Sequence, residues 1–270
     1  MVDKSHSPQS TIATQKPREF ALLSAQNLNK SFGGIQAVKN VSITVKPGSI
    51  TGLIGPNGAG KTTLFNLLSN FITPDSGEVI FDGEPIHHLR SHQIAQQGLI
   101  RTFQVARVLS RLSVLENMLL GGQKQSGENL FNVLFQPKRV QREQKQQRDR
   151  AFALLESVGL AEKAYEYAGA LSGGQRKLLE LARAMMTHPK LILLDEPAAG
   201  VNPTLINQIS DHVLCWNQEG ITFLIIEHNM DVIMSLSQEI WVLAEGMNLA
   251  QGTPQEIQGN SEVLEAYLGQ

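Results

Sequence analysis

The chain has 270 residues, of which 41% are hydrophobic and 18% charged, and its formal net charge at pH 7 is −2. A chain of this length can bury a substantial core, and it lacks the overall basicity of a protein that binds duplex nucleic acid. Its one cysteine, Cys215, forms neither an internal disulfide nor a zinc site, so we expect a small core residue.

The N-terminal segment, residues 1–19, is polar and rich in Pro, Ser, Thr and Gln, which predicts a disordered tail. The segment has no signal-peptide core, and no apolar run approaches the roughly 18 residues that a membrane-spanning helix needs. These features predict a cytoplasmic protein in reducing surroundings.

Strand-like apolar runs follow the tail and are separated by Gly and Pro. The first group of runs covers residues 20–29, 41–46, 49–54 and 77–83. From about residue 85 to 170 the pattern becomes mostly helical and more polar. A second group of runs then covers residues 191–197, 222–228 and 239–246. The sequence therefore predicts an α/β protein whose sheet core is interrupted by a helical insertion.

The segment GLIGPNGAGKTT, residues 52–63, fits the phosphate-loop template G-x-x-x-x-G-K-[ST] through Gly55, Gly60, Lys61 and Thr62. It lies between a strand-like run and a helix-like run. Its glycines let successive backbone N–H groups face an oxyanion, and the helix N-terminus adds its dipole. We expect Lys61 to reach the terminal phosphates and the Thr62 hydroxyl to ligate Mg²⁺.

Within the helical region, the segment PKRVQREQKQQRDR, residues 137–150, carries six basic and two acidic residues. Such a run is typical of a solvated helix face, and contact with phosphate or lipid is the alternative.

The segment LSGGQRKLLELARAMM, residues 171–186, places Ser172, Gly173 and Gly174 just before a helix with apolar residues at three- and four-residue spacing. Helix capping alone would explain Ser172. The two glycines, however, also allow the backbone to approach an oxyanion closely. The chain therefore carries two candidate phosphate-binding elements.

The segment LILLDEP, residues 191–197, predicts a buried parallel strand that ends in two carboxylates, at the edge where open α/β sheets bind ligands. Asp195 is a candidate partner of Mg²⁺, either directly or through water. Glu196 is a candidate general base that polarises the attacking water. A solvated pair of carboxylates is the alternative, and the complete phosphate loop upstream argues against it.

The ordered set GPNGAGKTT, RTFQ, LSGGQ, LILLDEP and IIEH resembles the ATP-binding subunits of ABC transporters, from Phe20 to the C-terminus. The resemblance implies an α/β fold of the P-loop NTPase (RecA-like) type, with an antiparallel β subdomain and an inserted helical (signature) subdomain. It implies a catalytic core of residues 20–84 and 171–270 and a helical subdomain of about 85–170. It also implies an ATPase that binds ATP and Mg²⁺ and hydrolyses ATP at a head-to-tail dimer interface to drive transport.

The resemblance also assigns roles to single residues. Glu196, His228 and Gln104 are the implied catalytic residues: Gln104 touches Mg²⁺ and the attacking water, and His228 is the switch histidine at the γ-phosphate. Alone, Gln104 and His228 would be a surface amide and a strand-end imidazole. The implied nucleotide-binding residues are Phe32, Gly55, Pro56, Asn57, Gly58, Ala59, Gly60, Lys61, Thr62, Thr63, Ser172, Gly173, Gly174 and Gln175. The implied metal ligands are Thr62, Gln104 and Asp195.

Two of these roles depend on position in the family pattern. Phe32 falls where the family stacks an aromatic ring on adenine, and a core or turn aromatic is the alternative. The segment from Ser172 to Gln175 would clamp the γ-phosphate held by the opposite subunit. In EPAAGVNP, Ala198, Ala199 and Asn202 depart from the commoner family pattern, so this loop's part in communication across the dimer is not implied.

The segments FGGIQAV, GLIRTFQ, EPAAGVNP and EHNMDVI are similar to subunits that drive uptake of branched-chain and other hydrophobic amino acids, as is the helical insertion at about 121–150. The resemblance implies permease partners, a second ATP-binding subunit, an indirectly associated solute-binding protein, and no nucleic acid. It places the chain peripherally on the cytoplasmic side of the cell (inner) membrane. Urea or amide uptake, lipid or polysaccharide export, and a soluble non-transport ATPase are the alternatives. The last is disfavoured by a single cassette without sustained heptads.

Overall fold

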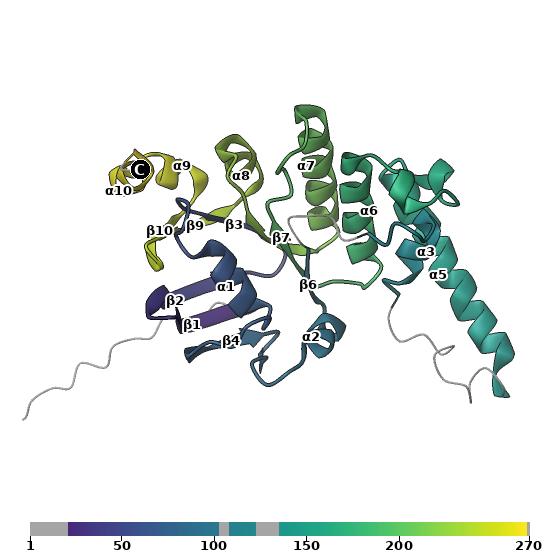
Figure 1. Ribbon diagram of the computed structural model, residues 1–270, viewed down its shortest axis with the longest axis horizontal. Helices are drawn as coiled ribbons and strands as arrows, with labels where there is room; N and C mark the ends of the chain where they lie inside the picture. Colours follow the sequence, from purple (N-terminus) through teal and green to yellow (C-terminus); the bar gives the residue numbers. More distant parts are fainter. Residues whose placement is uncertain (1–20, 103–107, 123–134, 269–270) are drawn as a thin grey trace, which may run out of the picture.

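The structure is a computed structural model, and it describes residues 21–102, 108–122 and 135–268. The expected tail, residues 1–19, and Gln104 lie outside the described residues. Figure 1 shows two sheets on one side of the molecule and a group of helices on the other. No helix of the described residues is long and apolar enough to cross a membrane.

The smaller sheet has four strands in the order β2-β1-β4-β5, and its pairs are antiparallel. These strands are β1 (Leu23–Phe32), β2 (Ile35–Val45), β4 (Ser76–Phe81) and β5 (Glu84–Pro85). β1 and β2 form a hairpin whose two-residue loop is Gly33 and Gly34, both with positive φ. Such a loop matches the right-handed twist of the strands that it joins.

The larger sheet has six strands in the order β10-β9-β3-β8-β7-β6. These strands are β3 (Ile50–Ile54), β6 (Leu99–Arg101), β7 (Leu191–Asp195), β8 (Thr222–Ile226), β9 (Glu239–Ala244) and β10 (Met247–Gly252). β10 pairs antiparallel with β9, and the other neighbours pair in parallel. The carboxyl ends of the parallel strands therefore meet at one edge.

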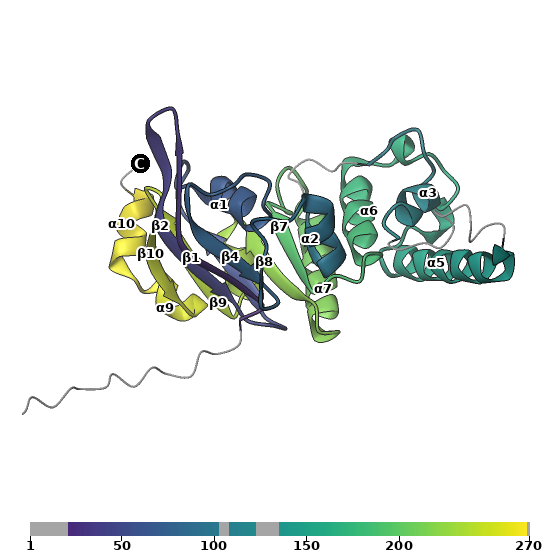
Figure 2. The ribbon, with the colours of Figure 1, turned by 90° about the horizontal axis from the view of Figure 1, so that it is seen from below.

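The helices are α1 (Lys61–Leu68), α2 (Ser91–Gln97), α3 (Val114–Leu119), α5 (Pro137–Ser157), α6 (Gly173–Met185), α7 (Pro203–Gln218), α8 (Met230–Leu236), α9 (Pro254–Gln258) and α10 (Ser261–Leu268). Short 3₁₀ turns cover Ala161–Lys163 and Ala168–Ala170. In Figure 2, α3, α5 and α6 lie at the end of the molecule that is remote from the antiparallel sheet.

Both faces of the larger sheet are buried at its central strands β3, β8 and β7, which explains why these strands are continuous apolar runs. Along β7, Leu191 and Leu193 face a cluster that includes α1 and the antiparallel sheet. Ile192 and Leu194 face a second cluster, which includes α6 to α8. All four side chains are fully or almost fully buried. One strand thus contributes side chains to two cores, one on each face of the sheet. Cys215 of α7, in contrast, is exposed to solvent and is not the core residue expected from the sequence.

Two strands of the larger sheet were not expected from the sequence. β6 is three residues long and lies in a stretch with a helical and polar pattern. β10 alternates few apolar residues with polar ones and has no buried residue, because it is the edge strand of the sheet. Edge strands are exposed to solvent and carry weaker apolar patterns than central strands.

The basic run forms the N-terminal two thirds of α5, a helix of 21 residues with only Val140, Ala151 and Leu155 buried. Four basic residues of this run, here called the basic quartet, are Lys138, Arg139, Arg142 and Arg148. All four are exposed to solvent, as expected for a solvated helix face.

Candidate nucleotide-binding and catalytic site

The phosphate loop connects β3 to α1, as predicted, and it contacts β9 of the larger sheet and β2 of the smaller sheet. Gly55 has φ +150°, and a Cβ there would lie 2.1 Å from the carbonyl oxygen of Leu243 in β9. Gly60 has φ +95°, and its Cβ would lie 2.5 Å from the carbonyl oxygen of Ala37 in β2. Real Cβ atoms do not approach backbone oxygens so closely, so both positions require glycine.

Lys61 is the first residue of α1 and is 6% exposed. Its Nζ donates hydrogen bonds to the carbonyl oxygens of Gly55 (2.7 Å) and Pro56 (2.9 Å). Burial lowers the pKa of the Lys61 ammonium, and the nearby carboxylates of Glu196 and Asp195 oppose that shift. A cation held in the loop by neutral carbonyls gains stronger, charge-assisted partners when phosphate oxygens enter.

The oxygen donors that Mg²⁺ would need lie beside this loop. Thr62 is exposed on the first turn of α1, and the carboxylate of Asp195 ends β7. Within residues 21–102, 108–122 and 135–268, no group of three or more His, Cys, Asp or Glu side chains is arranged so that it could hold a metal ion by itself. Mg²⁺ is commonly held by one or two carboxylates together with waters and substrate phosphates, so this sparse oxygen set fits it.

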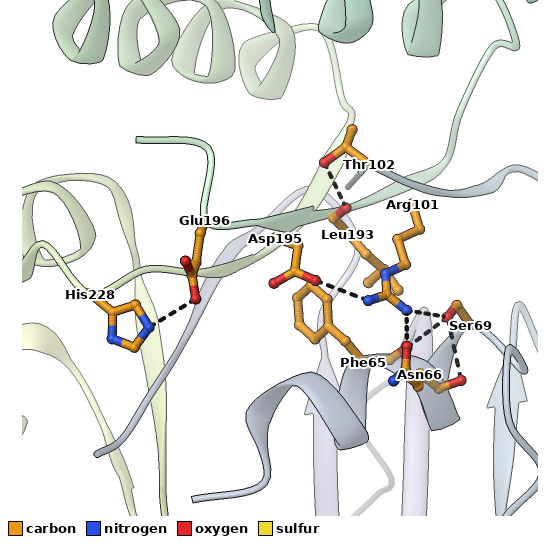
Figure 3. A network of polar contacts seen from close by, with 9 residues as sticks. All are labelled: Phe65, Asn66, Ser69, Arg101, Thr102, Leu193, Asp195, Glu196 and His228. Carbon is orange, nitrogen blue, oxygen red and sulfur yellow. Dashed lines mark hydrogen bonds and ion pairs between the residues drawn. The ribbon is translucent and has the colours of Figure 1, made fainter. Parts of the chain in front are cut away.

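Asp195 is held by Arg101, the last residue of β6 (Figure 3). The Nη2 atom of Arg101 lies 2.9 Å from the Oδ2 atom of Asp195, and the two side chains are only 10% and 8% exposed. The Nη1 atom donates to Asn66 Oδ1 (2.6 Å) and Ser69 Oγ (3.3 Å), both of α1 or its C-terminal end. The guanidinium also lies over the ring of Phe65, 5.8 Å from its centroid.

Arg101 therefore joins the helix after the phosphate loop to the strand that carries Asp195. Sequence reasoning gave this residue no role, although it belongs to the quoted RTFQ segment. The pairing depends on β6 lying beside β7, where Arg101 is aligned with Leu193, and no strand was expected at β6.

Glu196 and His228 come together at the ends of two adjacent parallel strands (Figure 3). The Nε2 atom of His228 lies 2.9 Å from the Oε1 atom of Glu196. The Glu196 side chain is 17% exposed, so its carboxylate can reach a water molecule. Glu196 has φ +49°, an uncommon left-handed conformation for a residue other than glycine. Uncommon backbone geometry of this kind is concentrated at functional sites.

The segment with Ser172 begins α6 through a capping box. Ser172 Oγ accepts from the Gln175 N–H (3.2 Å), and Gln175 Oε1 accepts from the Ser172 N–H (3.0 Å). The two glycines differ: Gly173 faces open space, whereas a Cβ on Gly174 would lie 2.4 Å from the Leu205 side chain of α7. Gly174 thus serves the packing of α6 against α7. Figures 1 and 2 both show α6 apart from α1.

Phe32 is 48% exposed at the end of β1, so one ring face is open to a ligand. The Nζ atom of Lys30 lies 5.7 Å from the ring centroid, a cation–π distance, and also pairs with Asp75 at 2.7 Å. In the phosphate loop, Asn57 and Gly58 are open to solvent.

The C-terminal helix also reaches the phosphate loop, which no pattern in the sequence indicated. The phenol of Tyr267 in α10 lies near the backbone of Gly55, and burial raises the pKa of this phenol. A cavity of about 410 Å³ lies next to this contact, with loop residues on one side and Glu265 and Ala266 on the other.

Comparison with known proteins identifies the fold and the family. Residues 38–199 match a family model described as ABC transporter. Residues 248–270 match one described as branched-chain amino acid ATP-binding cassette transporter. Among solved structures, a nucleotide-free ATP-binding cassette from an ABC transporter is 38% identical with a TM-score of 0.79, covering 93% of this chain and 100% of that one. An ADP conformation of such a cassette is 39% identical with the same TM-score and coverage.

Curated relatives agree with this result over nearly the whole chain. The high-affinity branched-chain amino acid transport ATP-binding protein LivG of Escherichia coli (strain K12) is 41% identical over 250 residues, covering 92% of this chain and 98% of that protein. The probable branched-chain amino acid transport ATP-binding protein LivG of Archaeoglobus fulgidus is 41% identical, covering 92% of this chain and 95% of that protein. These matches confirm the expected P-loop NTPase fold, and the chain belongs to the ATP-binding, ATP-hydrolysing subunits of ABC transporters.

Proposed function

We propose that this chain is the motor subunit of an importer for branched-chain or other neutral amino acids. The observation that carries this proposal is the 40–41% identity to proteins named for branched-chain amino acid transport, which extends over 92% of the chain. The match of residues 248–270 to a branched-chain amino acid cassette model supports the same solute class. Urea or amide uptake and lipid or polysaccharide export are the alternatives.

The phosphate loop binds ATP through its backbone N–H groups and Lys61. On binding, the Lys61 ammonium exchanges the carbonyl oxygens of Gly55 and Pro56 for terminal phosphate oxygens. Thr62 and Asp195 would hold Mg²⁺, which neutralises the charge of the phosphates when it is bound. The ion pair with Arg101 keeps the Asp195 carboxylate at the end of β7 in this arrangement. Phe32 offers its exposed ring face to the adenine.

Glu196 activates and orients the attacking water, and His228 holds the Glu196 carboxylate in place through the 2.9 Å contact. Gln104 completes the catalytic set in this proposal. Because α6 stands apart from α1, the segment Ser172–Gln175 acts on ATP bound by a second ATP-binding subunit rather than on its own. Closure of this head-to-tail pair on ATP, and its opening after hydrolysis, is the motor step.

The proposal includes the division into a catalytic core, residues 20–84 and 171–270, and a helical subdomain of about 85–170. It also includes the partners of the motor. They are permease subunits in the cell (inner) membrane, a second ATP-binding subunit of the same or another kind, and indirectly a solute-binding protein. The chain acts peripherally, on the cytoplasmic side of that membrane.

The variant Glu196→Gln tests the catalytic assignment. It should bind ATP as the native chain does, while turnover falls about 10²- to 10⁴-fold, the usual contribution of general-base assistance. Because ATP is not consumed, light scattering with Mg-ATP should show a dimer, formed with the partner ATP-binding subunit if the pair is mixed. With ADP it should show a monomer. The matched control Glu239→Gln, on the far end of β9, should behave as the native chain.

Adding Ser172→Arg to Glu196→Gln should abolish the dimer, since a bulky cation would occupy the place of the opposite phosphate. Normal hydrolysis by Glu196→Gln would exclude Glu196 as the base. Tight ATP binding without pairing to any ATP-binding subunit would exclude the shared site. The solute is tested separately, by uptake of labelled leucine against labelled urea in vesicles that contain the assembled transporter.

A further inference from the structure

The carboxylate of Glu227 joins two loops of the site, and the proposed function so far gives it no role. Glu227 follows β8 and is 3% exposed. Its Oε1 atom accepts a hydrogen bond from the Ala198 backbone N–H at 2.6 Å. Its Oε2 atom accepts from the backbone N–H groups of His228 (3.1 Å) and Asn229 (3.4 Å). One buried side chain thus bridges the loop after β7 and the loop after β8.

The same two loops carry the catalytic pair. Glu196 lies two residues before Ala198, and His228 directly follows Glu227. The 2.9 Å contact between Glu196 and His228 therefore depends on the relative position of the two loops. A backbone bond from the Glu196 N–H to the Ile226 carbonyl (3.0 Å) fixes the first residue of the loop after β7, and the Glu227 carboxylate fixes the next turn.

The composition of the loop after β7 makes this carboxylate important. Ala198 and Ala199 offer only backbone groups for polar contacts. Gly200, with φ +70°, is exposed and has no neighbouring atoms where a Cβ would lie. Ala199 and Gly200 are exposed and contribute no packed side chain, so the backbone bond from Ala198 to Glu227 has a large share in the position of this part of the loop.

The charge of Glu227 is also balanced from the signature helix. Lys177 of α6 is 4% exposed. Burial lowers the pKa of its ammonium, whereas the carboxylates of Glu180 and, next in size, Glu227 oppose the shift. A buried carboxylate is tolerated where it is hydrogen-bonded and a cation lies nearby, and Glu227 has three backbone donors and the nearby Lys177. The carboxylate thus lies between the signature helix and the two catalytic loops.

We propose that Glu227 is a positioning residue for ATP hydrolysis. Its carboxylate sets the loop of residues 196–202 against the loop of residues 227–229, and thereby holds His228 in contact with Glu196. This inference rests on the proposed function, in which Glu196 is the general base. It makes Glu227 act through the catalytic pair and not on ATP, because none of its hydrogen bonds reaches the phosphate loop.

The test compares Glu227→Gln with the control Glu239→Gln in the full chain, paired with its partner ATP-binding subunit where turnover requires one. An amide has one acceptor end, so it cannot serve Ala198 on one side and His228 and Asn229 on the other. Misplacement of a catalytic group by about 1 Å can cost about 100-fold, so kcat should fall about 10- to 100-fold. The KM for ATP and the binding of a fluorescent ATP analogue should stay within about twofold, since the loop with Lys61 is untouched.

A double-mutant cycle separates positioning from general damage. If Glu227 acts through the catalytic pair, Glu227→Gln should cause almost no further loss of turnover in a Glu196→Gln background. Glu227→Asp keeps the charge beside Lys177 but withdraws the carboxylate by one methylene. It should lower kcat in the same way, which provides a second variant if the amide disturbs folding.

The outcomes distinguish the two proposals. If Glu196→Gln hydrolyses ATP normally, the proposed catalytic function is wrong. If Glu196→Gln is inactive while both Glu227 variants keep native kcat, only the positioning role is wrong. Losses that multiply in the double variant, or a KM that rises together with the fall in kcat, would also overturn positioning, because a general structural defect acts independently of Glu196.

Discussion

Replacing Arg101 by methionine removes the guanidinium that joins β6, α1 and the end of β7 while keeping the length of the side chain. The structure predicts a large loss of stability. The Asp195 side chain is 8% exposed and would lose its ion-pair partner at 2.9 Å. Removing one partner of a buried ion pair costs about 3–5 kcal/mol, because the other charge stays buried and uncompensated. The hydrogen bonds to Asn66 and Ser69 are lost as well.

The free energy of unfolding should be measured by urea titration without nucleotide, since bound ATP adds stability by mass action. For a domain of this size each kcal/mol shifts the Tm by about 2–4 °C, so the Tm should fall by about 6–20 °C. The matched control is Arg139→Met. Arg139 is 61% exposed and pairs with Glu143 one turn along α5, so its loss should cost at most about 0.5 kcal/mol.

Arg101→Lys sharpens the comparison. Lysine keeps the charge but not the planar fork that serves Asp195 and Asn66 together, so its stability should lie between those of the native chain and Arg101→Met. If Arg101→Met unfolds at the same urea concentration as Arg139→Met, the ion pair does not stabilise the junction of loop, helix and strand, and the reasoning is refuted.

Three further predictions concern other parts of the chain. Gly55→Ala should lower the free energy of unfolding by more than the about 1–3 kcal/mol that backbone strain at positive φ costs, and should abolish ATP binding, because the added Cβ meets the Leu243 carbonyl. The control is Gly48→Ala, which also has positive φ but lies in open space, and equal losses in the two variants would contradict this prediction. Changing the basic quartet to glutamine should leave ATP turnover without membranes intact and weaken binding to anionic phospholipid vesicles by roughly 1 kcal/mol per charge; a fall in turnover would make the quartet structural. Hydrogen bonds from the backbone and side chain of Thr253 lower the pKa of Glu256 below the 4.5 of an unfolded glutamate. The contribution of Glu256 to stability is therefore present above pH 4.5 and is lost as the pH falls through the pKa of the folded state. In urea titrations, Glu256→Gln should be less stable than the native chain at about pH 7 and equally stable in acid.

The elements that carry the candidate site were more predictable from the sequence than the residues that hold those elements together. The phosphate loop and the strand before Asp195 were expected because glycines at fixed spacing and a continuous apolar run have few other uses. Arg101 and Glu227 were not, since their roles arise from strands that pair only in the folded sheet. Gly174 was expected to admit a ligand, and its tight contact with Leu205 adds a packing reason that spacing cannot reveal.

The strand order of the larger sheet has a consequence for folding during synthesis. β3, which leads into the phosphate loop, pairs on one side with β8 and on the other with β9, and Ile50 lies opposite Phe223. More than half of the chain must leave the ribosome before β3 finds either neighbour. At about 5–20 residues per second, this central apolar strand waits for roughly ten seconds or more. The antiparallel hairpin of β1 and β2 needs only adjacent residues and can form early. The candidate nucleotide site therefore cannot assemble until β8 has been synthesised, and until then the apolar β3 lacks the neighbours that bury it.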